Sequence, residues 1–238
     1  MSVHQILPFL STAVMAAFVA AVFRRYAERR GTHLLLWGIG LTMFGLGSFA
    51  EAYLAVGWNP WIFRAWYLFG AALNAAWLGQ GTVYLLVRRR EVAHALLAVL
   101  ILGSLFAGYL MLTTPLDSSA YTPARPISEQ YRAIMPSRAP VRLTTPFFNV
   151  YGLITLVGGA LYSAYLLWRR QTFPQRVVGN ILIAAGALSV AAAGTLTRLG
   201  AGQYLYLGEL LAATLMFAGF LLATQRPAVS TALQEAGR

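Results

Sequence analysis

The sequence predicts an all-α, polytopic membrane protein with seven transmembrane helices. First, 58% of its 238 residues are hydrophobic and only 11% are charged, whereas a soluble domain carries about 25% charged residues. Second, seven stretches reach the roughly 20 apolar residues that a transmembrane helix requires. Third, arginines cluster at alternate ends of these stretches, which is typical of a chain that crosses a membrane repeatedly.

The whole chain, residues 1–238, is predicted to form one transmembrane domain. A window of about 20 apolar residues defines each span to within a few residues. The spans fall at about 3–23, 33–57, 61–87, 92–112, 146–168, 177–199 and 204–224, with a loop at 113–145 and a tail at 225–238.

The arginine distribution predicts the orientation. All 18 basic residues are arginines, and the formal net charge is +11. Twelve of the arginines follow spans one, three, five and seven, and the positive-inside rule assigns these to the cytoplasm. We therefore expect the N-terminus outside and the C-terminus inside a cell membrane, specifically a bacterial inner membrane. We expect lipid headgroups as partners of these arginines, and no nucleic acid. The twelve are Arg24, Arg25, Arg29, Arg30, Arg88, Arg89, Arg90, Arg169, Arg170, Arg176, Arg226 and Arg238.

The long outer loop at 113–145 contains five prolines, and Ser128 is placed to cap a short helix that runs through Met135 and ends before Pro136. Such a loop serves as a lid or docking surface, or else simply connects spans four and five.

Several kinds of chemistry are excluded by missing residue types. The chain contains no lysine and no cysteine, which removes retinal pigments, P-loop ATPases, thiolate metal sites and iron–sulfur clusters. The histidines form no inward pair at matched depth within the spans, and the single aspartate lies in the loop, which disfavours a haem, a metal site and a catalytic triad. We expect no cofactor, and an enzyme is the least favoured class. The residues considered are His4, His33, His94 and Asp117.

Ionisable residues inside the spans mark the candidate ligand-binding site, because such side chains are costly in a membrane and usually face a partner or a wet cavity. Glu51 and Glu209 stand at a similar depth, in the outer third, and we expect them to pair with Arg64 and Arg198. An acid–base pair or proton relay of the two glutamates is the one catalytic hypothesis that remains. The full candidate set is Glu51, Arg64, Asn74, Asn149, Arg198 and Glu209.

These residues support two interpretations. An outward-opening polar pocket would hold an anion against the arginines or a cation against the glutamates. Alternatively, two interhelical ion pairs only fix the register of the helices. The nearby aromatic residues are expected to form the outer aromatic belt: Trp58, Trp61, Trp66, Tyr204 and Tyr206.

A parallel 3+1+3 repeat is suggested because spans one and five both end in an aromatic residue followed by two arginines, Phe23-Arg24-Arg25 and Trp168-Arg169-Arg170. In layout alone, the chain resembles SWEET and PQ-loop transporters and rhodopsin-like bundles. Residues 37–86 also resemble the seven-helix sensor regions of some bacterial histidine kinases. The segments 142–146 and 158–163 resemble uncharacterised bacterial seven-helix integral membrane proteins, which implies no activity.

Three functions follow as hypotheses. The first is binding or transport of a small polar or amphipathic molecule through an outward-facing polar pocket. The second is a non-catalytic subunit or assembly factor of a larger membrane complex. The third is a sensor that acts through a separate cytoplasmic partner. A seven-helix fold hosts unrelated activities, so the choice depends on the site.

Overall fold

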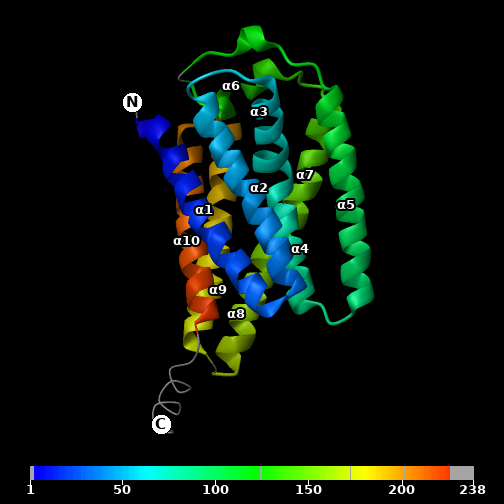
Figure 1. The fold of residues 1–238 in the computed structure, drawn as a ribbon, viewed down its shortest axis with the longest axis vertical. Coiled ribbons are helices and arrows are strands. Elements are labelled where there is room, and N and C mark those ends of the chain that lie inside the picture. The colour runs from blue at the N-terminus through cyan, green and yellow to red at the C-terminus, as the bar shows by residue number, and fades with distance from the viewer. Residues whose placement is uncertain (1–2, 124, 172, 201, 226–238) are drawn as a thin grey trace.

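The computed structural model describes residues 3–123, 125–171, 173–200 and 202–225, with the side chains of residues 3–5, 198 and 203 excepted. In this part of the chain all regular structure is helical. Long helices stand side by side (Figure 1). The elements are α1 (Val3–Arg29), α2 (Thr32–Leu54), α3 (Pro60–Ala65), η1 (Trp66–Leu73), α4 (Asn74–Leu86), α5 (Arg90–Thr113), η2 (Ser118–Ala120), α6 (Ile127–Ile134), α7 (Pro140–Gly152), η3 (Leu153–Gly158), α8 (Gly159–Arg169), α9 (Pro174–Arg198), η4 (Gly202–Tyr204) and α10 (Leu205–Thr224).

Six helical segments of the described chain are long and apolar enough to cross a membrane, which supports a multi-pass membrane protein. They are Ile6–Arg29, Thr32–Leu54, Arg90–Thr113, Pro140–Arg169, Pro174–Thr197 and Leu205–Thr224. The expected third span corresponds to α3, η1 and α4, which follow one another without a gap. This stretch includes Asn74 and Gln80 and is not among the six.

The fifth predicted span begins earlier than expected, at Pro140 rather than at residue 146. Pro140 occupies the first helical turn, where its missing N–H costs nothing. Pro146 lies inside α7 and does not end it.

Two π-helical segments interrupt the regular winding of the long helices, η1 before α4 and η3 between α7 and α8.

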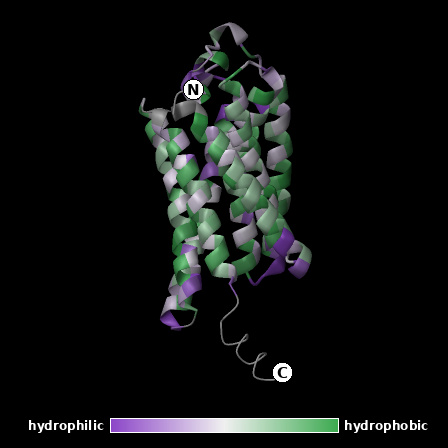
Figure 2. Ribbon diagram, turned by 60° about the vertical axis from the view of Figure 1, so that its left-hand side comes forward, coloured by the Kyte–Doolittle hydropathy of each residue, from purple (hydrophilic) through white to green (hydrophobic). Residues whose placement is uncertain are grey.

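The two ends of the bundle differ in charge. Most strongly hydrophilic ribbon lies at the end where α1, α4 and α8 finish (Figure 2). We call this the arginine-rich end, formed by residues 24–30, 88–90 and 169–176. Arg25 there donates a 3.0 Å hydrogen bond to the Thr224 carbonyl, which joins the ends of α1 and α10. The opposite end, which carries the segment between α5 and α7, is called the loop end (Figure 1).

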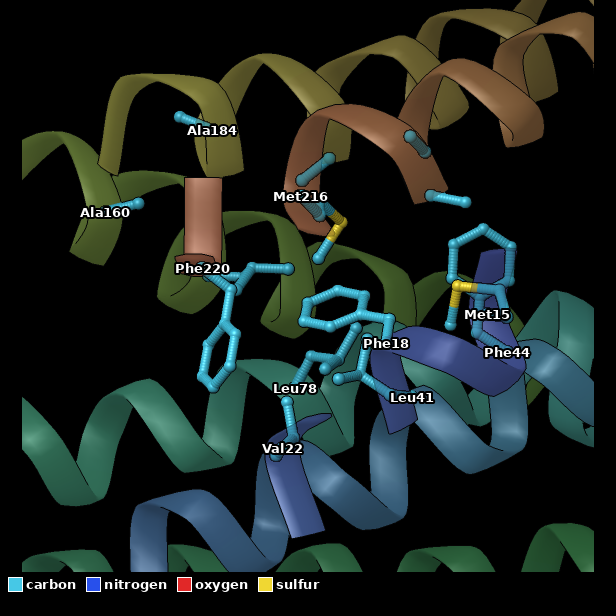
Figure 3. Packing of buried hydrophobic residues seen from close by; sticks show 14 of the residues in the cluster. Met15, Phe18, Val22, Leu41, Phe44, Leu78, Ala160, Ala184, Met216 and Phe220 are labelled. Atoms are coloured by element: carbon cyan, nitrogen blue, oxygen red, sulfur yellow. The ribbon is translucent and has the colours of Figure 1, made fainter. Parts of the chain in front are cut away.

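The bundle core consists of aliphatic, methionine and phenylalanine side chains from helices far apart in the sequence. Phe18 of α1 stacks on Phe217 of α10 with ring centroids 5.1 Å apart. Leu41 of α2 and Leu78 of α4 belong to the same buried cluster (Figure 3). These contacts tie α1 and α2 to α4 and α10, which the chain order alone does not do.

Glycine permits one especially close helix contact near the loop end. A Cβ atom on Gly47 of α2 would lie 2.5 Å from the Cα of Gly70 in η1. Only hydrogen at both positions allows the two backbones to approach this closely. The contact positions Glu51, one helical turn further along α2, beside η1.

The helix α5 lies at the side of the bundle (Figure 1) and exposes a row of large apolar side chains, among them Leu102, Leu105 and Phe106. This position suits the linker helix of the predicted 3+1+3 layout. The repeat itself remains a prediction. The two π-helical segments fall in the third and fifth predicted spans, which are not equivalent positions of the two triplets.

Residues 114–139 fold as a cap over the loop end. The short helix expected through Met135 is present as α6, but Ser128 does not cap it: Pro126 is the N-cap residue, and Ser128 lies inside the helix with a buried hydroxyl that has no partner among the described residues. Ile127, Ile134 and Met135 are 2%, 0% and 0% exposed, respectively. They pack in one cluster with Leu54 and Phe63 of the long helices. The segment is thus a packed cap rather than a plain connector.

Candidate functional site

Glu51 lies buried at the loop end of α2, near the end of the helix that the sequence predicted. Its Oε1 atom accepts a 2.8 Å hydrogen bond from the indole N–H of Trp66 in η1. Its carboxyl group also forms a side-chain hydrogen bond with Glu209 of α10. The structure therefore brings together the two glutamates that the sequence placed at similar depth. We call them the carboxyl pair.

The expected ion pair of Glu51 with Arg64 is wrong. Arg64 donates hydrogen bonds to the carbonyl oxygen atoms of Met111 and Thr114, the latter at 3.0 Å. These carbonyls belong to the C-terminal end of α5, where backbone acceptors lack helical partners and the helix dipole is negative. Arg64 therefore caps α5 instead of compensating Glu51.

The expected pair of Glu209 with Arg198 lies outside the described residues, because the side chain of Arg198 is not described. Within the described part of the chain, arginine–carboxylate ion pairs involve only Glu28 and Glu129. Neither member of the carboxyl pair has an arginine partner there.

The two candidate asparagines bind backbone rather than each other or the carboxyl pair. Asn74 donates a 2.7 Å hydrogen bond to the carbonyl of Gly70, and Asn149 donates a 3.2 Å hydrogen bond to the carbonyl of Ala71. Both acceptors lie in η1, where π-helical winding disturbs the ordinary i to i−4 pairing. The asparagines thus support the irregular segment that carries Trp66.

A hydrogen bond between two carboxyl groups needs one proton between them, because two carboxylates only accept. Oε2 of Glu51 and Oε2 of Glu209 are buried and, apart from the contact between the two carboxyl groups, accept no hydrogen bond from a described residue. Buried oxygen atoms that no other donor reaches are rare in folded proteins. A ligand that donates hydrogen bonds could take the place of the shared proton.

Aromatic side chains surround the carboxyl pair. Trp66 and Tyr206 are 5% and 2% exposed, so their expected place in the aromatic belt is wrong. The Trp66 indole turns inward because its N–H needs an acceptor, and Glu51 supplies it. Tyr206 stands three residues before Glu209 on the same inward face of α10. Trp61 and Tyr204 are exposed, as a belt residue would be.

The cap closes over this group. Tyr206 interacts through a hydrogen bond with the backbone of Ile127, the first residue of α6. The ring of Tyr131 lies 5.9 Å from that of Trp66, centroid to centroid. The hydroxyl of Tyr121 donates a 2.7 Å hydrogen bond to the Leu54 carbonyl at the end of α2.

More buried oxygen atoms without partners occur at the same end of the bundle. The Ser48 hydroxyl lies one turn before Glu51 on α2, and the Ser128 hydroxyl lies on α6 of the cap. Both side chains are buried. The loop-end half thus contains more polar capacity than its own residues satisfy. In the described chain, no group of three or more His, Asp or Glu side chains is arranged to hold a metal ion.

No protein-family model matches the chain, and neither a curated protein nor a solved structure gives a match. The functional argument therefore depends on the geometry of the site.

Proposed function

We propose that the protein binds and transports a small polar molecule that carries positive charge, and that the carboxyl pair is its binding site. The observation that supports this proposal is the direct contact of two buried glutamates from α2 and α10 with no arginine partner among the described side chains. Of the two ligand charges that the sequence left open, this favours the cation.

The energetics favour a cation or a proton at this place. An ionised carboxylate inside a membrane protein costs several kcal/mol unless it is paired. A shared proton neutralises one of the two groups. A ligand with an ammonium group would replace that proton and donate to the Oε2 atoms of Glu51 and Glu209, which no other described donor reaches. The nearby ring faces of Trp66 and Tyr131 would add cation–π attraction.

We further propose that residues 60–86 form a seventh span, with the N-terminus outside and the C-terminus inside a bacterial inner membrane. The clustering of arginines at one end of the bundle supports this orientation. The carboxyl pair then lies in the outer half, and the cap covers it from outside. Ligand entry from outside would require the cap to move away from Trp66 and Tyr206.

Native mass spectrometry of the gently purified protein tests the proposal. The variants are Glu51→Gln and Glu209→Gln, which keep the shape of the side chain and remove its charge. Glu28→Gln is the matched control, because Glu28 is half-exposed at the arginine-rich end. We expect a non-lipid adduct on the wild type and on Glu28→Gln that both other variants lack. The same adducts on all four proteins would contradict the proposal.

A further inference from the structure

The hydroxyl of Ser11 in α1 is buried and has no hydrogen-bond partner among the described residues. The side chain is 0% exposed. Ser11 stands one helical turn before Met15 and two turns before Phe18, and both of these residues belong to the bundle core (Figure 3). Residues spaced by three and four lie on one face of a helix, so Ser11 is on the inward face of α1. A polar group therefore interrupts this apolar face near the loop end.

Two contacts fix the register of α1 against α10, one within the helices and one near their ends. In each contact the partners are 199 positions apart in the sequence, so the two helices run parallel. The same register places Ser11 beside Leu210, the residue that follows Glu209. The two contacts are Phe18 with Phe217 and Arg25 with Thr224.

The helix α2 follows α1 through a short turn, runs back towards the loop end and brings Ser48 to the same level (Figure 1). A Cβ atom on Gly45 of α2 would lie 3.4 Å from the Cβ atom of Met15, which fixes the register of these two helices. At a rise of about 1.5 Å per residue, Ser11 stands about 6 Å beyond Met15 towards the loop end. Ser48 stands about 4.5 Å beyond Gly45 in the same direction.

Ser11, Ser48 and the carboxyl pair thus lie within about one helical turn of each other in depth, on the inward faces of α1, α2 and α10. Ser48 is three residues before Glu51 on one face of α2, and Glu209 is one turn before the core residue Ala213 of α10. Ser48 is 2% exposed, and its hydroxyl, like that of Ser11, has no partner among the described residues. Buried hydroxyls normally find a partner. These two instead leave acceptor oxygen atoms for a ligand that the carboxyl pair holds.

We propose that the carboxyl pair, Ser11 and Ser48 together bind a primary ammonium group. This inference rests on the proposed function and names its substrate class, a primary amine. A primary ammonium group has three N–H donors and no acceptor. The Oε2 atoms of Glu51 and Glu209 accept two of the three, and a serine hydroxyl accepts the third, which the carboxyl pair alone would leave unpaired. A quaternary ammonium group has no N–H to donate and gives the serines no role.

The stability of the ligand-free protein separates a ligand role of the serines from a structural one. A buried hydroxyl without a partner is destabilising, because it has lost its hydrogen bonds to water. Ser11→Ala and Ser48→Ala should therefore leave the unfolding temperature in detergent unchanged or raise it. A serine that supports the fold would show the opposite, so a lower unfolding temperature in both variants would overturn the ligand role.

Methylammonium chloride, a small primary ammonium probe, tests the binding itself. A ligand that binds the folded state raises its unfolding temperature with increasing concentration. We expect a saturable rise for the purified full-length protein, and an affinity about tenfold weaker when Ser11→Ala and Ser48→Ala are combined. Ser104→Ala with Ser163→Ala is the matched control, because these two hydroxyls already have partners on α5 and α9. Equal affinities in both double variants would overturn the role of Ser11 and Ser48.

Two other salts separate a primary ammonium group from other cations. Tetramethylammonium chloride, which has no N–H, should raise the unfolding temperature no more than sodium chloride at the same concentration. A rise equal to that with methylammonium would indicate cation–π attraction alone and would overturn the primary ammonium site. A methylammonium response no larger than that of sodium chloride would also overturn it.

Glu51→Gln separates the failure of this inference from that of the proposed function. We expect the methylammonium response to be lost in Glu51→Gln and weakened in the double variant of Ser11 and Ser48. Loss in Glu51→Gln with full affinity in the double serine variant would overturn the serines and leave the carboxyl pair as the site. A full response in Glu51→Gln would overturn the proposed function as well.

Discussion

The loop-end half and the arginine-rich half of the bundle bury opposite kinds of surface. The loop-end half buries two carboxyl groups and several unpartnered hydroxyls beneath a packed cap. The arginine-rich half buries apolar side chains and carries exposed arginines at its end. A fold that only needed stability would not bury two carboxyl groups against each other. We therefore propose the carboxyl pair of the capped half as the binding site.

The largest effect should come from the contact that positions the capped half. Gly47→Ala places a Cβ atom 2.5 Å from the Cα of Gly70, and backbone cannot move aside easily. We expect a loss of about 1–3 kcal/mol in the free energy of unfolding. Thermal unfolding in detergent measures it. Gly194→Ala is the control, since nothing lies within 4 Å of a Cβ there; equal losses in both variants would refute the close contact.

The next effect concerns the carboxyl pair. Glu51→Ala leaves the Trp66 indole and Glu209 without their partner, and we expect a loss of about 1–3 kcal/mol. Glu51→Gln can still accept from the indole and should cost much less, near the average of about 0.6 kcal/mol for hydrogen bonds inside a membrane protein. Unfolding temperatures of the two variants check this. A Gln variant as unstable as the Ala variant would mean that the negative charge itself stabilises the fold.

Arg64 should matter for stability and not for the ligand. Arg64→Ala removes two hydrogen bonds to the end of α5 and should cost about 1 kcal/mol. The adduct seen by native mass spectrometry should remain on this variant. Loss of the adduct in Arg64→Ala at unchanged unfolding temperature would return Arg64 to the binding site, as the sequence first suggested.

The smallest effect lies in the cap. Hydrogen bonds from the hydroxyl and backbone N–H of Ser119 lower the pKa of Asp117 below its usual range. Because the folded pKa is lowered, the stabilisation is present at neutral pH and is lost as the pH falls through that folded pKa. In Asp117→Asn, the protection of the backbone amides of residues 118–120 against hydrogen exchange should therefore depend slightly less on pH in the acid range. An unchanged profile would show that the carboxylate contributes nothing to the cap.

Six of the seven predicted spans correspond to described helical segments long and apolar enough to cross a membrane, because hydropathy is a local property of the sequence. The similar depth of Glu51 and Glu209 followed from counting residues along each span. Their direct contact did not follow, because counting gives depth and not which helices are neighbours. The arginine partners of the two glutamates were also assigned by depth alone. Arg64 instead donates hydrogen bonds to backbone carbonyls at the C-terminal end of α5.

The inward turn of Trp66 was missed for a different reason. Trp66 was assigned to the aromatic belt because it stands near the outer end of its span. The π-helical segment η1, which begins at Trp66, departs from the 3.6 residues per turn of an α-helix and so changes the direction of its side chains around the helix axis. The burial of α6 is indicated by the sequence itself, because the apolar residues Ile127, Ile134 and Met135 recur at helical spacing. That pattern favours a packed cap over a connector.

Infrared spectroscopy of the protein in membranes at neutral pH tests the shared proton of the carboxyl pair most directly. A protonated carboxyl group has a C=O band separate from that of a carboxylate. We predict such a band in the ligand-free wild type and in ligand-free Glu28→Gln, and its disappearance when Glu51→Gln and Glu209→Gln are combined. Absence of the band in the ligand-free wild type would mean that the two glutamates share no proton, which would contradict the account.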